Sequence, residues 1–421
     1  MPPSTAVASE AKPAGLFHRG LRRAVHGVVG VLFAAALSAS AAMAASDDFN
    51  IGFIGTLSGA GADRAQDQLD GFQLAVKHLG GRLGGMEFNL SAFDDKRSPE
   101  TARQLAVRLT QTEHVHVLLL SSDEVVSAAA IPVALAAKTF VISLDAPAAR
   151  FAGKECSPYL FSVAGLAETM HEVAGQYLQA QGYGTVVVVR PGGAEDAQAL
   201  DAFRRGFKGN LAEIVSRRGE MNFDDTLDRI RRESPDAVYV LDSGGMAVNF
   251  LIQFAASGLK NEFRLFAPGS GFDQTVLSAA GPASVDALSV APWSPDLDAP
   301  SNHRLVADFE TDYGRLPSLY AAEGYDAAML LDSALKAVDK KFTQGDLFRA
   351  ALRRADFAST RGSFRFDTNQ FPIQSYLVRQ VTTDGRDQLV DEQRGVLVRD
   401  LRDGHAAECP MRWVPEPPPK G

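Results

Sequence analysis

The sequence has few of the residues that metal and redox centres use. It contains two cysteines and eight histidines among 421 residues, and they are scattered without the close Cys/His spacing that zinc sites require. The catalytic patterns GxSxG, HExxH and HxExxC are absent too. We therefore predict no metal site, no cofactor and no enzyme activity. A secreted hydrolase with two catalytic carboxylates stays an alternative, because such pairs have no fixed spacing.

Long apolar runs are also scarce, and the one that stands out lies near the N-terminus. Three arginines within residues 19–23 precede "AVHGVVGVLFAAALSASAAMA" (24–44), which ends in the small-x-small triplet "AMA". This order of a basic, an apolar and a small-residue region is typical of a secretory signal peptide. We expect residues 1–44 to be removed by cleavage near Ala44 and the protein to be periplasmic. A retained N-terminal anchor is the alternative.

The expected export decides how the two cysteines, Cys156 and Cys409, are interpreted. A pair of cysteines in an exported protein is most simply interpreted as a disulfide. Such a bond would tie the C-terminus back to the middle of the chain. Two free buried thiols are the alternative.

Size and charge restrict the number of domains and the class of partner. Removal of residues 1–44 would leave 377 residues, which favours two domains over one compact core. The whole chain has a formal net charge of -9, and the removed segment carries four basic residues and one acidic one. The mature chain would therefore be near −12, which argues against nucleic acid or an anionic membrane surface as partner.

Strand and helix signals alternate from residue 50 onward. The segments "VHVLLL", "GTVVVVR", "DAVYVL" and "FRLFAPG" are continuously apolar rather than alternating. Strands that helices cover on both faces have this composition, so the pattern predicts parallel sheets. The β-α-β-α rhythm occurs twice and is interrupted at "VAPWSPDLDAP" (290–300). We predict the α/β class, with three helices within 302–355 and then a terminal pair of strands.

Four stretches together resemble one family. They are "IGFIGTLSGAGA", "SAFDDKRSPETARQLAVRL", "SAAAIPVALAAKTFVIS" and "RGSFRFDTNQFPIQSYLVRQV". In order and spacing they are similar to the solute-binding proteins of ABC importers, in the branch with leucine/isoleucine/valine-, amide- and urea-binding proteins. The resemblance extends from about residue 50 to residue 381. It implies a monomer that captures a solute by hinge closure and delivers it to a membrane permease with its ATPase. A sensor subunit that feeds a membrane receptor is the alternative.

The resemblance also implies an architecture of two doubly wound lobes with a ligand cleft between them. Three crossing strands, near 160–162, 289–293 and 356–362, would join the lobes. Lobe one would comprise 49–160 and 291–357, and lobe two 163–288 and 361–381. Residues 382–421 would form a C-terminal extension tied back by the disulfide. The solute would lie at the carboxyl ends of the strands, where open α/β sheets bind ligands.

Residues after the strands are the candidate cleft residues. The glycine-rich turn "GTLSGAGADR" lacks both the Lys-Ser/Thr of a P-loop and the third glycine of a dinucleotide fingerprint, so we do not expect a nucleotide there. The predicted ligand contacts are Ser58, Ser121, Ser122, Asp123, Asp145, Ala146, Glu195, Ser243, Ser270, Phe272 and Trp293. The serines and aspartates could equally serve as N-caps of the helices that follow.

The resemblance also shows three departures from the pattern of amino-acid-binding relatives. Asp145-Ala146-Pro147 stands where those relatives have a small residue and a threonine, Ala194 or Glu195 stands where they have a tyrosine, and Asp123 or Glu124 stands where they have a hydroxyl group. A carboxylate beside a ligand carboxylate would repel it. The departures therefore favour an amine-bearing or polyhydroxylated solute, or an aromatic ligand held differently, over an ordinary amino acid.

Overall fold

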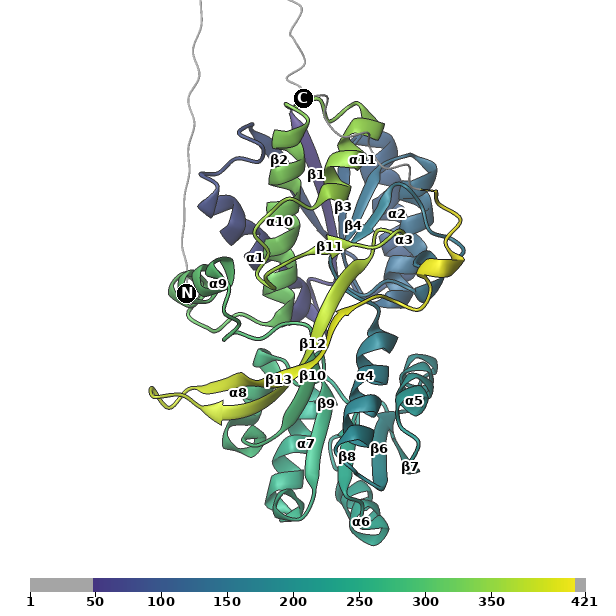
Figure 1. Cartoon of the computed structure of the whole chain (residues 1–421), viewed down its shortest axis with the longest axis vertical. Helices are drawn as coiled ribbons and strands as arrows, with labels where there is room; N and C mark the ends of the chain where they lie inside the picture. Colours follow the sequence, from purple (N-terminus) through teal and green to yellow (C-terminus); the bar gives the residue numbers. More distant parts are fainter. Residues whose placement is uncertain (1–47, 413–421) are drawn as a thin grey trace, which may run out of the picture. The chain divides into compact units, whose positions relative to one another are not determined.

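The computed structural model describes residues 48–412 (Figure 1). The predicted signal peptide, 1–44, lies outside the described residues. Within them, no helix combines the length and apolar character that a membrane span requires. We use lobe one for the part built on the first sheet and lobe two for the part built on the second.

Lobe one contains a five-stranded parallel sheet in the order β2-β1-β3-β4-β5 (Figure 1). Its strands are β1 Phe49–Gly55, β2 Phe88–Asp94, β3 Val117–Ser121, β4 Phe140–Ser143 and β5 Leu160–Ser162. The helices of this lobe are α1 Ala62–His78, α2 Pro99–Val107, α3 Glu124–Ala136, α9 Pro300–Tyr313, α10 Leu319–Ala337 and α11 Gly345–Arg354. Along β1, Ile51 and Phe53 pack in the cluster with α1 and α10, whereas Ile54 packs with α2 and α3. Both faces are thus covered, which explains the continuous apolar strands.

Lobe two contains a mixed eight-stranded sheet, with the order β11-β12-β10-β9-β8-β6-β7 and β13 paired to β12. Its strands are β6 Thr185–Pro191, β7 Asn210–Ser216, β8 Ala237–Val240, β9 Arg264–Pro268, β10 Leu288–Ala291, β11 Arg365–Phe366, β12 Pro372–Thr383 and β13 Leu389–Leu401. The helices are α4 Ala167–Ala180, α5 Ala194–Gly206, α6 Asp224–Glu233, α7 Gly244–Ala256 and α8 Gln274–Ala280. Strands β6 to β10 run parallel, and β12 is antiparallel to β10. The α/β prediction is confirmed.

The C-terminal part departs from the sequence prediction. Strand β13 pairs along β12, with irregular register near Tyr376 and Val378. From the sequence, residues 382–421 are expected only to form a C-terminal extension tied back by the disulfide. In the structure most of β13 is half-exposed, as suits a strand at the margin of a sheet. The exact residue boundaries of the two lobes remain predictions.

Two buried arginines hold the segments that pass between the lobes. Arg361 contacts Asp326 of α10 through Nε and Nη2 at 3.1 and 3.0 Å, and their side chains are 5% and 0% exposed. Its Nη1 donates to the carbonyl of Val163 at 2.8 Å and to Gln374 Oε1 at 3.3 Å. Arg361 therefore joins the segment after β5, the segment before β11 and strand β12.

Arg379 of β12 holds the third crossing segment, which follows β10, in a similar way. Its Nε donates to Ser289 Oγ of β10 at 3.0 Å, and Nη1 donates to the carbonyl of Trp293 at 3.2 Å. Its Nη2 forms an ion pair with Asp391 of β13 at 2.8 Å, and both side chains are almost fully buried. Asp391 Oδ1 has no hydrogen-bond partner, so the attraction between the two charges must offset the cost of burying them.

The predicted disulfide is confirmed. Cys156 and Cys409 are bonded across a sequence separation of 253 residues, with their Cα atoms 5.6 Å apart. The alternative of two free thiols is wrong. By the chain-entropy model, closing so long a loop stabilises the folded state by about 5 kcal/mol.

Glu323 of α10 is a buried acid next to these crossing segments. It is 4% exposed, and Gln68 Nε2 donates to its Oε2 at 3.3 Å and to the carbonyl of Leu144 at 2.7 Å. Burial raises the pKa of Glu323 to about 8, although the positive charge of Arg361 acts in the opposite direction. The folded state therefore favours the neutral carboxyl.

The Arg361–Asp326 pair can be tested by substitution. Asp326→Asn keeps the size of the side chain but leaves the buried guanidinium without its charge partner, so we expect the free energy of unfolding to fall by about 3 kcal/mol. Asp346→Asn is the matched control, because Asp346 pairs with Arg349 at an exposed position of α11. Urea denaturation measures both. A loss below about 1 kcal/mol in Asp326→Asn would contradict the role of the pair.

The buried acid predicts a pH dependence of stability. Because the folded-state pKa of Glu323 lies above its ordinary value of 4.5, its stabilisation is complete below pH 4.5 and is lost as pH rises towards 8. We expect Glu323→Gln to melt near the wild-type temperature at pH 5 and above it at pH 8. Thermal melts across this range provide the measurement. If the wild-type protein instead melts at a higher temperature than Glu323→Gln, by a margin that grows with pH, Glu323 is ionised in the folded protein.

Candidate ligand-binding site

The loops after β1, β3 and β4 lie side by side, because these strands are neighbours in the sheet. Two backbone hydrogen bonds fasten them: Thr56 N donates to the carbonyl of Ser121 at 3.1 Å, and Leu144 N donates to that of Leu120 at 2.8 Å. The first loop turns into α1 at Gly61, whose φ of 90° is left-handed and suits glycine. The carboxyl edge of the lobe-one sheet is thus a continuous surface of three loops.

Arg64 is the cation on this surface. It lies in the first turn of α1, and its Nη1 is 2.9 Å from Asp145 Oδ2. Its guanidinium carbon lies 5.7 Å from the ring centroid of Tyr320, and a quarter of its side chain, 26%, is exposed. A positive charge at a helix N-terminus opposes the macrodipole, so it needs local partners. Burial disfavours this charge, but Asp145, Tyr320 and Asp123 together outweigh it, so the pKa of Arg64 is raised overall.

Asp145 is the main carboxylate beside this cation. Its residue is 9% exposed, and Oδ1 accepts a hydrogen bond from the backbone N–H of Ala146 at 2.9 Å. Ser143 Oγ donates to the carbonyl of Asp145 at 2.8 Å and holds the loop in place. Burial raises the pKa of Asp145, while Arg64 acts to lower it. Of the predicted contacts, Asp145 therefore pairs directly with Arg64, and Ala146 bonds to Asp145.

The other predicted residues of lobe one are already bonded within the lobe. Ser121 donates to Gln68 and Ser122 donates to Asp95, and both serines are 1% exposed. Asp123 caps α3 by accepting from Val126 N at 3.1 Å and also pairs with Arg97. The exposed Ser58 donates to Asp94 at 2.5 Å. Their hydroxyl and carboxylate groups shape the loops, and a role in ligand contact stays a prediction.

The predicted residues of lobe two differ widely in exposure. Glu195, in the first turn of α5, and Ser243, just before α7, are exposed, and Ser270 is half-buried after β9. Phe272 is fully buried in the lobe-two core. Its ligand contact also stays a prediction.

Trp293 packs in the core of lobe one, where its Nε1 donates to Asn302 Oδ1 at 2.7 Å. Trp293 therefore packs beside the crossing segment near 289–293. The indole is 1% exposed, so contact with a solute would require it to be uncovered, and that contact remains a prediction.

Electrostatic interactions connect loops of the two lobes. Burial raises the pKa of Glu124 at the start of α3, and the carboxylate of Glu195 from lobe two raises it further. Burial also raises the pKa of Asp273, the N-cap of α8, while the charge of Arg64 acts to lower it. The charge of Glu195 in lobe two thus affects Glu124 in lobe one, and the charge of Arg64 in lobe one affects Asp273 in lobe two.

Three residues at the carboxyl edges of the two sheets were not predicted from the sequence. Arg64, Asp242 and Asp273 all lie at strand ends or helix starts. Asp242 follows β8, is 0% exposed, and burial raises its pKa to about 7. A signal for Arg64 was available, because a basic residue in the first turn after a glycine-rich loop opposes the helix dipole. Asp242 and Asp273 resemble ordinary turn residues in sequence and give no comparable signal.

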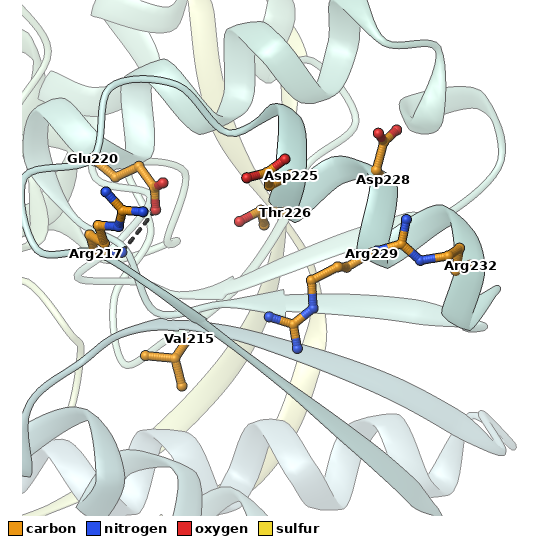
Figure 2. Close-up of a pocket in the computed structure, with 8 residues that line it drawn as sticks. All are labelled: Val215, Arg217, Glu220, Asp225, Thr226, Asp228, Arg229 and Arg232. Carbon is orange, nitrogen blue, oxygen red and sulfur yellow. Dashed lines mark hydrogen bonds between the residues drawn. The ribbon is translucent and has the colours of Figure 1, made fainter.

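Lobe two also has a cavity of about 350 Å³ that does not contain any of the predicted cleft residues. Figure 2 shows its eight lining residues, which come from the end of β7, the turn after it and α6. Arg217, Arg229 and Arg232 line it, and the backbone N–H of Arg217 donates to Glu220 at 2.8 Å. Strand β7 is at the far end of the sheet from β11. We do not treat this charged hollow as the solute site.

The described part of the chain contains no group of three or more His, Cys, Asp or Glu side chains arranged to hold a metal ion. One guanidinium with a stacked tyrosine can bind an anion, and the surrounding carboxylates can bind a cation or accept from hydroxyl groups.

Comparison with known proteins agrees with this architecture. A family model described as "Periplasmic binding protein" matches residues 48–386. A solute-binding protein of an ABC transporter from Rhodopseudomonas palustris, solved with benzoate, has 28% identity and a TM-score of 0.79 over 86% of this chain and 100% of that chain. An ABC transporter substrate-binding protein from Sphaerobacter thermophilus has 26% identity and a TM-score of 0.78, covering 84% of this chain and 98% of its own.

Curated relatives point in the same direction. "Leu/Ile/Val-binding protein homolog 6" of Brucella melitensis is 22% identical over 358 residues, which covers 82% of this chain and 91% of that protein. A leucine-binding protein from Thermotoga maritima shares the fold, with a TM-score of 0.71 at 19% identity. The chain belongs to the periplasmic binding protein family.

Proposed function

We propose that the protein is the periplasmic component of an ABC importer and that it binds a small aromatic carboxylate between its two lobes. Arg64 is the observation that carries the proposal, because it offers a partly exposed guanidinium beside a tyrosine ring at the carboxyl edge of the sheet. A guanidinium is a strong partner for a carboxylate, and an apolar body is stabilised by removal from water. The relative solved with benzoate, at 28% identity, supports this class of solute.

Capture follows from the arrangement of the loops. The solute carboxylate would replace Asp145 as a partner of Arg64, and loops of lobe two would cover the ring as the lobes close. Hinge closure of this kind buries the ligand and sets its release. Delivery would then be to a membrane permease with its ATPase. A sensor subunit that passes the closed form to a membrane receptor remains the alternative, and genes neighbouring this one would distinguish the two.

An amine-bearing solute is the second candidate. The observation that favours it is the number of carboxylates near Arg64, namely Asp145, Asp123 and Asp273, which act on Arg64 or are acted on by it. An ammonium group would be attracted where a carboxylate is repelled. The two candidates make opposite predictions for the same substitutions.

Substitution of Arg64 tests the aromatic carboxylate directly. Arg64→Met removes the charge while keeping a long side chain, so we expect the Kd for benzoate to rise about 30-fold or more, equivalent to ~2 kcal/mol. Arg103→Met is the control, because Arg103 is an exposed arginine of α2 paired with Glu100. Isothermal titration calorimetry on protein refolded from denaturant gives both values. Benzoate affinity equal to wild type in Arg64→Met would count against the proposal.

Substitution of Asp145 separates the two candidates. Asp145→Asn removes the carboxylate that competes for Arg64, so a benzoate-type ligand should bind about tenfold more tightly. An amine-bearing ligand should instead bind more weakly, because its counter-charge is lost. The same titration with benzoate, hydroxybenzoates, polyamines and branched-chain amino acids measures the direction. Weaker binding of every aromatic acid would favour the amine.

A further inference from the structure

The segment after β13 crosses from lobe two to lobe one. We name residues 402–409 the strap. Strand β13 belongs to the lobe-two sheet, and the strap ends at Cys409, which is bonded to Cys156 next to the start of β5 in lobe one. The disulfide therefore adds a covalent connection between the lobes to the crossing segments of the main chain.

Polar contacts fix the first two residues of the strap to the turn between β11 and β12. Arg402 Nη1 donates to Asp367 Oδ1 at 2.8 Å, and Asn369 Nδ2 donates to Asp403 Oδ2 at 2.8 Å. Asn369 also donates to the carbonyl of Ala152 at 2.8 Å, which places it on lobe one. The strap thus lies along a lobe-one surface between its first residues and the disulfide.

One side chain of the strap reaches back to lobe two. His405 Nε2 is 2.6 Å from Glu168 Oε1, in the first turn of α4. Glu168 also pairs with Arg205 of α5 at 3.1 Å, so it is firmly part of lobe two. The His405 ring faces a second carboxylate, Glu408, at 3.7 Å. Movement of α4 away from lobe one must separate His405 from Glu168 or pull the strap with it.

We propose that the strap is a redox-sensitive latch on the hinge. With the disulfide intact, His405 is held against α4 and the hinge motion is restricted. A dithiol reductant releases the latch: its thiolate attacks Cys156 Sγ, the bond to Cys409 Sγ breaks, and both cysteines end as thiols while the reductant becomes a disulfide. Cys409 is 6% exposed and Cys156 is half-buried, so Cys156 is the more exposed residue of the pair.

Hydrogen exchange at α4 tests the latch without any ligand. We compare the oxidised protein, the protein reduced with dithiothreitol, and His405→Gln with its disulfide intact. The backbone amides of the first turn of α4 should exchange about threefold faster in both altered forms, as expected for loss of one partly exposed ion pair. The strap amides should exchange faster only after reduction. His303→Gln is the control, because His303 is an exposed histidine of α9.

Equal exchange at α4 in all three forms would overturn the latch, whatever happens to the melting temperature. The effect of the latch on the solute rests on the proposed function and needs a second readout. Stopped-flow measurement of benzoate release should give a rate several-fold higher after reduction and in His405→Gln. Unchanged release rates would overturn the connection to the solute site. A protein that binds no aromatic acid would overturn the proposed function, and the exchange experiment would then decide the latch alone.

Discussion

Two buried arginine–aspartate pairs hold together the segments on which the two lobes depend. Arg361 with Asp326, and Arg379 with Asp391, place charged groups at positions with almost no exposed surface. Removing such charges from water is costly, so each guanidinium is surrounded by carbonyl, amide or hydroxyl oxygens. The donors of Arg361 and Arg379 fix where each crossing segment lies against the next.

Helix α10 connects the candidate site to these buried pairs. Asp326, Glu323 and Tyr320 lie on this helix within two turns, and they contact the crossing segments, the Gln68 network and Arg64 respectively. Arg64 therefore contacts the same helix that holds the crossing segments through Asp326. Because Asp145 already partners this arginine, a solute carboxylate must offer a better contact than the protein's own carboxylate. In the proposed function, that competition would favour ligands with additional apolar surface to bury.

The sequence predicted the alternating α/β architecture because both physical signals are local. Apolar strands such as 117–121 and N-cap positions such as Ser98 depend on residues close in sequence. The disulfide followed from the small number of cysteines in an exported chain. Strand β13 was missed because its residues are polar and half-exposed, so its pairing with β12 is decided by neighbours far along the chain.

The site was harder to predict, because ligand contacts depend on which way a side chain points. The predicted serines do follow the strands, yet Ser121 and Ser122 are bonded to Gln68 and Asp95, which periodicity does not reveal. Arg64 acquires its importance only when β4 brings Asp145 beside α1. The most direct test of this account is a crystal structure of the protein with benzoate. We predict the carboxylate within hydrogen-bonding distance of the Arg64 guanidinium and the ring between the lobes. A solute bound elsewhere, with Arg64 still paired to Asp145, would contradict it.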